Sequence, residues 1–187
     1  MGSGHEKTKN MIFNFSKKYQ FTTQLSDKGE DIEIIKETKL LGKYITYDLK
    51  WNKNTTEIVK KAYRRMQLLN RAAKFTTKTN DLKSIYLTFV RSILEQSAVV
   101  WHSGLSKKNR KDLERVQKTG LKIILGNKFT TYKNGLKMLN LDTLDERRRK
   151  MCLKFAQNCL KNEKVKSMFP LKFSKHKIEL RKPTNLK

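Results

Sequence analysis

Apolar residues recur with a helical period along most of the chain after residue 52. The first stripe repeats every three or four positions, which is the spacing of an amphipathic helix; its members are Ile58, Ala62, Met66, Leu69 and Ala73. Residues 81–101 carry apolar side chains on more than one face and therefore predict a central, buried helix. Thr79 or Asn80 could cap its beginning.

Three further helices are predicted between residues 106 and 161. The first has a capping serine, Ser106, and a terminating glycine, Gly126; its expected core residues are Leu113, Val116, Leu121, Ile124 and Leu125. A short helix over residues 131–141 is weakened by Gly135. A Thr-x-x-Glu capping box at residues 143–146 opens the last helix, which we expect to face inward through Leu144, Met151, Phe155, Ala156, Cys159 and Leu160.

The first fifty residues have a different pattern, with short apolar runs separated by turn residues. Residues 11–15, 21–25, 32–35 and 39–45 predict four strands of a small antiparallel meander. The expected fold is therefore α+β and mainly α, with a small N-terminal β-meander followed by a bundle of four to five helices. The segment after Pro170 has no sustained period and is expected to be loose.

Composition adds a strong charge imbalance to this picture. The 187 residues include 43 Lys and Arg against 17 Asp and Glu, a formal net charge of +26. Such an excess opposes compaction and favours a polyanionic partner, with nucleic acid as the leading candidate. A generically basic surface is the alternative. A membrane surface is disfavoured, because the basic stripes alternate with an apolar core, and no apolar run is long enough to cross a bilayer.

The cations gather on two of the predicted helices. One group follows the outer face of residues 52–75, as a nucleic-acid contact or as an ordinary solvated face: Lys60, Lys61, Arg64, Arg65, Arg71 and Lys74. A second group lies at the beginning of the helix of residues 106–126: Lys107, Lys108, Arg110 and Lys111. Cations at this end of a helix oppose its dipole and cost stability, and binding of an anionic ligand would explain their placement.

Catalytic and metal-binding patterns are not evident in the sequence. It has no G-x-S-x-G motif, no phosphate-binding loop and no Asp-Asp pair, and its three histidines lack ligand spacing. Cys152 and Cys159 lie two helical turns apart, too far for a disulfide. We expect buried, reduced thiols and a reducing compartment, the nucleus or the cytoplasm. Glu95 and Gln96 could be a functional pair, but hydrogen bonds to a neighbouring helix are favoured.

Several segments, taken in order, resemble one family of polymerases. Residues 6–13 (EKTKNMIF) resemble the end of the palm domain of reverse transcriptases from non-LTR retrotransposons, jockey-like elements in particular. Residues 37–51 (ETKLLGKYITYDLKW) resemble the primer grip, a β-hairpin, of that family. Residues 52–69 and 82–105 resemble its helical thumb, and residues 112–126 and 139–162 resemble the segment that follows. The resemblance covers roughly residues 6–170.

The resemblance implies a division of the chain. After a flexible scar at residues 1–5, it gives a palm end with primer grip at 6–51, a thumb at 52–126, a helical segment at 127–169 and a loose basic tail at 170–187. Leu41, Gly42 and Lys43 would lie at the primer 3′ end, and Lys7 near the leaving pyrophosphate. An ordinary packed hairpin at this place is the alternative.

The family's catalytic aspartates have no counterpart in this sequence. The resemblance therefore implies an RNA–DNA hybrid partner, binding without polymerisation in isolation, and no cofactor in this chain, with Mg²⁺ expected only in the missing palm. The missing fingers and palm portion would be a second partner. The alternative is a retroelement-derived, standalone protein that binds nucleic acid or chromatin. Exposed apolar side chains at Phe13, Phe15 and Phe21 could also pair two copies in a homodimer.

Overall fold

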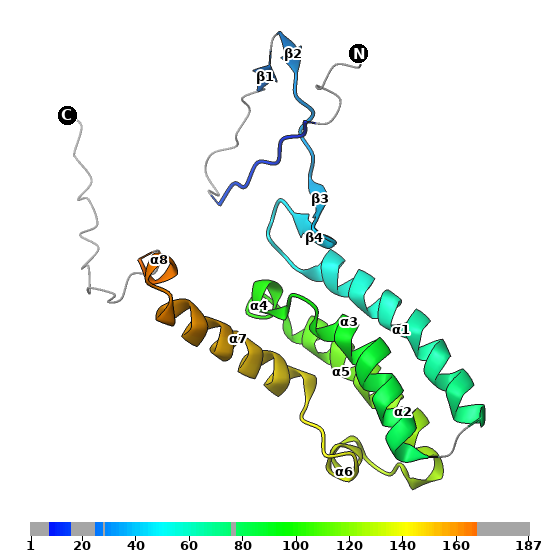
Figure 1. Cartoon of the computed structure of the whole chain (residues 1–187). Helices are drawn as coiled ribbons and strands as arrows, with labels where there is room; N and C mark the ends of the chain where they lie inside the picture. The colour runs from blue at the N-terminus through cyan, green and yellow to red at the C-terminus, as the bar shows by residue number, and fades with distance from the viewer. Residues whose placement is uncertain (1–7, 16–24, 28, 76–77, 168–187) are drawn as a thin grey trace, which may run out of the picture.

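Two small β-hairpins precede a helical bundle in this protein (Figure 1). The structure is a computed structural model and describes residues 8–15, 25–27, 29–75 and 78–167. The fold is α+β and mainly helical, which confirms the fold class predicted from periodicity. The helices form one core around Trp101, Tyr86 and Leu69, each with no more than a trace of exposed surface.

The expected N-terminal meander is replaced by two separate antiparallel hairpins. β1 (Ser26–Asp27) pairs with β2 (Glu30–Asp31), and β3 (Glu37–Leu40) pairs with β4 (Lys43–Thr46). Residues 11–15 and 32–35 are not strands; Asn10 and Ile34 form an isolated bridge instead. The strand predicted at 21–25 lies outside the described residues except for Leu25. Short apolar runs at the edge of so small a sheet are too weakly covered to sustain continuous pairing.

Helix α1 (Asn52–Phe75) buries the predicted stripe: Ile58, Ala62, Met66 and Leu69 are buried, and Ala73 is half-buried. It packs against α5 (Lys107–Leu125). Near the beginning of both helices, Asn109 Nδ2 donates to Asn52 Oδ1 at 2.9 Å. About three to four turns further on, Met66 lies beside Gly120. The two helices therefore run in the same direction.

The segment predicted as one helix over residues 81–101 is divided in the structure. It contains α2 (Thr79–Ile85), the π-helical η2 (Tyr86–Arg91), α3 (Ser92–Glu95) and α4 (Ala98–Trp101). The break before α4 lies at Ser97, which has a left-handed φ of 54°. The N-cap of α2 is Lys78, without a side-chain cap, so the predicted caps Thr79 and Asn80 are wrong.

Gly120 explains how η2 and α5 approach each other. A Cβ at that position would lie 2.7 Å from the Tyr86 ring. The buried Tyr86 hydroxyl donates to Gln117 Oε1 at 2.9 Å, one turn earlier on α5. A glycine on α5 therefore gives room for the one large aromatic side chain that anchors η2 in the core.

The predicted ends of the later helices are confirmed. The Ser106 side chain accepts from the Asn109 amide at the beginning of α5, and Gly126 ends this helix with a φ of 50°. A 3-10 turn, η3 (Gly126–Lys128), leads to α6 (Tyr132–Met138). Helix α7 (Leu144–Lys161) begins with the Thr143–Glu146 capping box, and α8 (Glu163–Lys166) follows it.

Only the first half of α7 joins the core. Leu144 is fully buried and Met151 is half-buried. Phe155, Ala156 and Leu160 are exposed, and Cys159 is half-buried, so the predicted inward face is wrong in the second half. The helix extends past α4, and within the described residues no helix of the bundle accompanies it that far (Figure 1). The free Cys152 and Cys159 are half-buried and not fully buried as expected.

Candidate nucleic-acid interface

A cleft of about 260 Å³ lies between the β3–β4 hairpin, α1 and the end of α3. Four cations from both strands of the hairpin and from α1 line it, and they are Lys39, Lys43, Lys61 and Arg64. The one carboxylate on its wall, Glu57, accepts from Lys60 Nζ at 3.0 Å. That hydrogen bond holds the pKa of Glu57 below its usual value. The cleft therefore carries a surplus of positive charge that its own acid does not neutralise.

Lys43 is the most buried of these cations, with 8% of its surface exposed. Its Nζ donates to Gln96 Oε1 at 3.4 Å, a neutral acceptor just after α3. Burial lowers the pKa of Lys43, and the nearby charge of Lys61 lowers it further. A half-desolvated ammonium without a carboxylate is costly for the free protein. An anion in the cleft would remove that cost.

The hairpin turn that carries Lys43 has an unusual tip. Leu41 and Gly42 both have positive φ, 47° and 79°, which is the conformation of a two-residue type I′ turn. Glycine adopts it without strain, but leucine does not. Leu41 is also 93% exposed, so packing within the protein does not compensate for the strain. The sequence therefore places an apolar side chain at the tip where stability alone favours asparagine.

A second feature of the cleft is an unused donor beneath the hairpin. Asn54 is 1% exposed and its Oδ1 accepts from the Tyr44 amide at 3.3 Å. Its Nδ2 is buried and has no hydrogen-bond partner among the described residues. Buried amide donors are normally satisfied by protein or by a bound molecule. Lys39 and Tyr44 face each other across the hairpin, and the Lys39 ammonium lies 5.7 Å from the Tyr44 ring centre.

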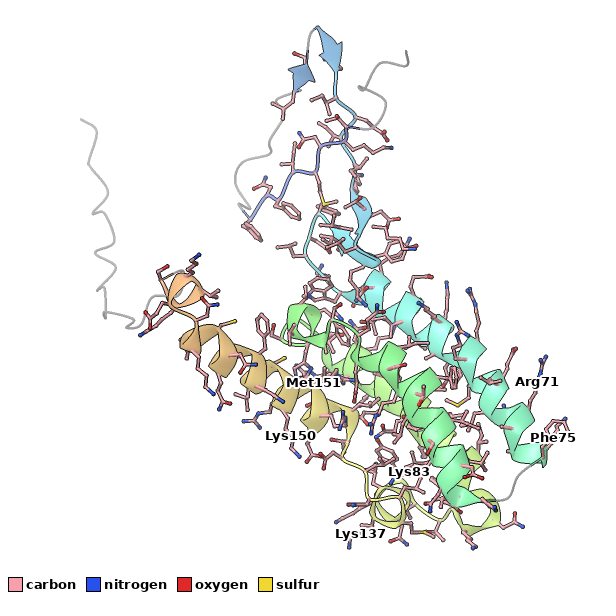
Figure 2. All side chains as sticks on the ribbon, in the orientation of Figure 1. Arg71, Phe75, Lys83, Lys137, Lys150 and Met151 are labelled. Atoms are coloured by element: carbon pink, nitrogen blue, oxygen red, sulfur yellow. The ribbon has the colours of Figure 1, made fainter. Side chains whose placement is uncertain are left out.

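The remaining cations of α1 extend outward from this cleft along the helix (Figure 2). Lys60, Lys61, Arg64, Arg65, Arg71 and Lys74 are all exposed. Of these six, only Lys60 has an ion-pair partner in the described part of the chain. Such a row leaves nearly all of its charge available to a polyanion.

The predicted group at the beginning of α5 divides into two kinds. Lys107, Lys108 and Lys111 are exposed, and the first turn of the helix contains no acid. Arg110 instead turns inward: its guanidinium pairs with Asp145 at 2.5 Å and donates to the His102 carbonyl at 3.2 Å. Arg110 therefore fastens α7 to the loop before α5, and we leave it out of the proposed interface.

Two arginines of the basic run at residues 147–150 have partners inside the protein. Arg147 pairs with Glu95 at 2.5 Å, which confirms that Glu95 bonds to a neighbouring helix. Arg148 is completely buried, with its guanidinium 5.7 Å from the Trp101 ring centre. The sequence carried a signal for this: Arg148 follows Leu144 by four residues and precedes Met151 by three, so all three share one helical face.

Lys39, Tyr44 and Asn54 also line the cleft, although the sequence pattern did not single them out. Lys7 lies outside the described residues. Among the residues described, no group of three or more His, Cys, Asp or Glu side chains is placed to hold a metal ion. No helix in the described ranges has the length and apolar character needed to cross a membrane.

Comparison with known proteins adds no relative: no family model, no curated protein and no solved structure matches this chain. Three features of the chain bear on its function: the cleft, the exposed cations and the sequence motifs. These agree on one surface, since Gly42, Lys43, Lys61 and Arg64 were each selected from sequence and all line the same cleft.

Proposed function

We propose that this chain binds nucleic acid by holding a sugar–phosphate backbone in the hairpin–α1 cleft. The observation that carries the proposal is the convergence of Lys39, Lys43, Lys61 and Arg64 on a cleft in which Glu57, the one acid among the described lining residues, is already paired. Phosphate contacts of this kind release counterions and do not depend on base sequence. The row of exposed cations on α1 lengthens the contact along the backbone.

The preferred ligand is an RNA–DNA hybrid, because the hairpin and the helix after it resemble a primer grip and thumb. In that setting the chain is the part of an RNA-directed DNA polymerase that grips primer–template. The strained, exposed Leu41 supports this role, since an apolar tip beside a basic cleft suits contact with a sugar. We propose no polymerase activity for the chain alone, and we expect any Mg²⁺ to belong to a separate palm portion.

A retroelement-derived protein that binds nucleic acid or chromatin by itself is the second candidate. The same cleft serves either function, so ligand preference separates them. A clear preference for the hybrid over duplex DNA supports the polymerase role. Equal affinity for both duplexes supports the standalone role. Phe13 and Phe15 are 44% and 79% exposed, and light scattering across a concentration series tests whether they pair two copies.

The decisive experiment is a titration of a fluorescent RNA–DNA hybrid at several salt concentrations. We compare the wild type with Lys61→Ala/Arg64→Ala, which removes two exposed cations from the cleft. The matched control is Lys133→Ala/Lys137→Ala, which removes two exposed cations from α6, at the opposite end of the bundle from the hairpins (Figure 2). Both variants have the same net charge, so the comparison isolates position from total charge.

We expect the cleft variant to bind about tenfold more weakly and to lose about 2 units of the salt slope. The control should keep most of its affinity. Equal losses in both variants would show that only net charge matters, and the proposed cleft would be rejected. Unchanged binding in the cleft variant would reject it as well.

A further inference from the structure

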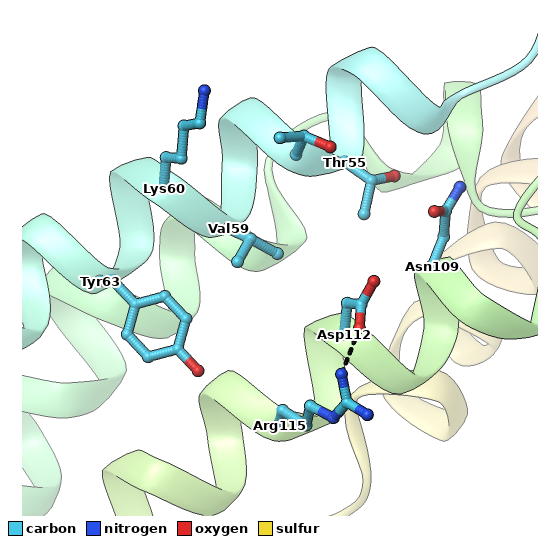
Figure 3. A pocket seen from close by; sticks show the side chains of 8 residues that line it. Thr55, Val59, Lys60, Tyr63, Asn109, Asp112 and Arg115 are labelled. Carbon is cyan, nitrogen blue, oxygen red and sulfur yellow. Dashed lines mark hydrogen bonds and ion pairs between the residues drawn. The ribbon is translucent and has the colours of Figure 1, made fainter.

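A second groove of about 260 Å³ lies on the other side of α1, between this helix and α5 (Figure 3). Its walls come from α1 (Thr55, Thr56, Val59, Lys60, Tyr63) and from α5 (Asn109, Asp112, Arg115). Pockets for drug-sized molecules are about 300–1,000 Å³. The groove is slightly smaller, which suits one planar ring system better than a larger ligand.

The chemistry of the groove differs from that of the hairpin–α1 cleft. Asp112 contributes a carboxylate that pairs with Arg115 at 2.8 Å, so the walls present acceptors as well as donors. Val59 and the Tyr63 ring add an apolar side, and the ring points toward α5 (Figure 3). A phosphate would meet the Asp112 carboxylate in this space. A nucleobase would not be repelled, because it has a flat apolar face and an edge with both donors and acceptors.

Thr55 provides an independent sign that the groove is unfilled. Hydroxyls within helices usually donate to the carbonyl four residues earlier, as Thr56, Ser84, Ser92 and Thr119 do here. Thr55 Oγ1 has no hydrogen-bond partner in the described structure, although the residue is only 2% exposed. A ligand edge in the groove would give this buried hydroxyl a partner.

We infer that the α1–α5 groove binds one unpaired nucleobase of the strand that the protein holds. Tyr63 stacks on the base, Thr55 and Asp112 hydrogen-bond its edge, and Lys60 lies at the rim beside the exposed cations of α1. A carboxylate accepts from an exocyclic amine, as in cytosine, so the groove favours cytosine or adenine over thymine. This inference rests on the proposed function, because the basic face of α1 brings the strand to the groove.

The test measures binding of a short oligodeoxycytidine and of the same sugar–phosphate chain without bases. The wild type should bind the base-bearing chain about tenfold more tightly, the usual effect of one base stacked on an aromatic side chain. Tyr63→Ala should reduce this ratio to near one. The matched control is Phe89→Ala, because Phe89 is 42% exposed, close to the 41% of Tyr63, and lies outside the groove.

Two gentler variants test the base edge. Thr55→Val keeps the side-chain shape and removes the hydroxyl. It should lower the ratio of affinities for the base-bearing and base-free chains about fivefold. Asp112→Asn should remove the preference for oligodeoxycytidine over oligothymidine. Cytidine 5′-monophosphate serves as a competitor: displacement only at millimolar concentration supports a base held within a strand. Displacement at micromolar concentration would replace this inference with a free-nucleotide site.

Failure of the groove and failure of the cleft give different results. If Tyr63→Ala leaves the ratio unchanged, or weakens both chains equally, the base site is rejected while the cleft stands. If Lys61→Ala/Arg64→Ala weakens both chains and preserves the ratio, both proposals are supported. If the wild type binds the RNA–DNA hybrid but neither single chain, the base site is rejected while the cleft stands. If it binds none of the three, both are rejected.

Discussion

The hairpin–α1 cleft and the buried beginning of α7 both gather cations, but the two regions use them in opposite ways. At α7, Arg110 and Arg147 meet Asp145 and Glu95, and the buried Arg148 lies against Trp101. In the cleft, Lys43, Lys61 and Arg64 line one cavity, and a neutral glutamine accepts from Lys43. A surplus of charge therefore marks a binding surface only where carboxylates and aromatic rings have not already engaged it.

The largest expected effect is on stability, and it should follow the loss of the Arg148 side chain at α7. Arg148→Ala removes a fully buried side chain and leaves a cavity beside Trp101, so we expect the free energy of unfolding to fall by about 3 kcal/mol. Urea unfolding followed by circular dichroism measures this. Arg148→Met should restore most of the loss, because the side chain packs well but two of its guanidinium nitrogens lack hydrogen bonds among the described residues.

Arg149→Ala is the matched control, since Arg149 is the exposed neighbour in the same basic run. Its unfolding free energy should change by less than about 0.5 kcal/mol. Affinity for the RNA–DNA hybrid should be unchanged in all the folded variants. Normal stability combined with lost affinity in Arg148→Ala would mean that Arg148 contacts the nucleic acid and does not stabilise the core.

The regular parts of the fold could be predicted from sequence, because local rules decide them. The apolar stripe of α1 repeats over about four turns, and the caps at Ser106 and Thr143 need only residues three positions away. The strands of the N-terminal region and the break at Ser97 depend on long-range pairing and on neighbouring helices, which no local window contains. The exposed second half of α7 has the same cause: its sequence is amphipathic, but the bundle ends before it.

The candidate cleft could be predicted only in part. Charge and the resemblance selected Gly42, Lys43, Lys61 and Arg64. Asn54 was not selected, because its place in the cleft depends on the hydrogen bond that its side chain accepts from the Tyr44 amide. Arg110 is paired with Asp145, which lies 35 residues later in the sequence, so its engagement could not be predicted from the basic run at the beginning of α5. Whether an arginine forms an ion pair depends on which residues the fold brings beside it, and residue spacing does not show this.

A smaller effect concerns the pH dependence of binding in the cleft. The pKa of Lys43 is lowered from 10.5, so the residue loses its proton earlier than an exposed lysine as pH rises. An anion bound beside Lys43 favours the charged form, so binding at a pH above this lowered pKa requires the lysine to take up a proton. Affinity for duplex DNA should therefore fall between neutral and alkaline pH, by up to about tenfold for the loss of one charged contact.

Lys43→Arg is the comparison, because a guanidinium stays charged over this range. The affinity of Lys43→Arg for duplex DNA, measured by fluorescence anisotropy, should change less with pH than that of the wild type. Parallel pH profiles for the two proteins would mean that Lys43 does not contact the bound phosphate.

Relief of strain at the hairpin tip should be smaller again. Leu41→Asn gives the Asn-Gly pair that type I′ turns prefer, and we expect a gain of about 0.5–1 kcal/mol in unfolding free energy. Leu40→Asn is the control, since Leu40 is also exposed but lies in β3, where asparagine is disfavoured. A higher unfolding free energy for Leu40→Asn, with no change for Leu41→Asn, would contradict the inference that the turn is strained. Weaker hybrid binding by Leu41→Asn would show that the strain serves the interface.

The smallest expected effect has the opposite sign from that of Arg148. Lys61 lines the same cleft as Lys43 and Arg64, and its charge disfavours the protonated form of Lys43. Lys61→Ala/Arg64→Ala should therefore raise the unfolding free energy by a few tenths of a kcal/mol, about the size of an exposed charge interaction. The gain should vanish in high salt, where the screening length falls to about 3 Å. Lys133→Ala/Lys137→Ala should show no comparable salt-dependent gain, and a loss of stability in the cleft variant would mean that its cations hold the fold together, as those of α7 do.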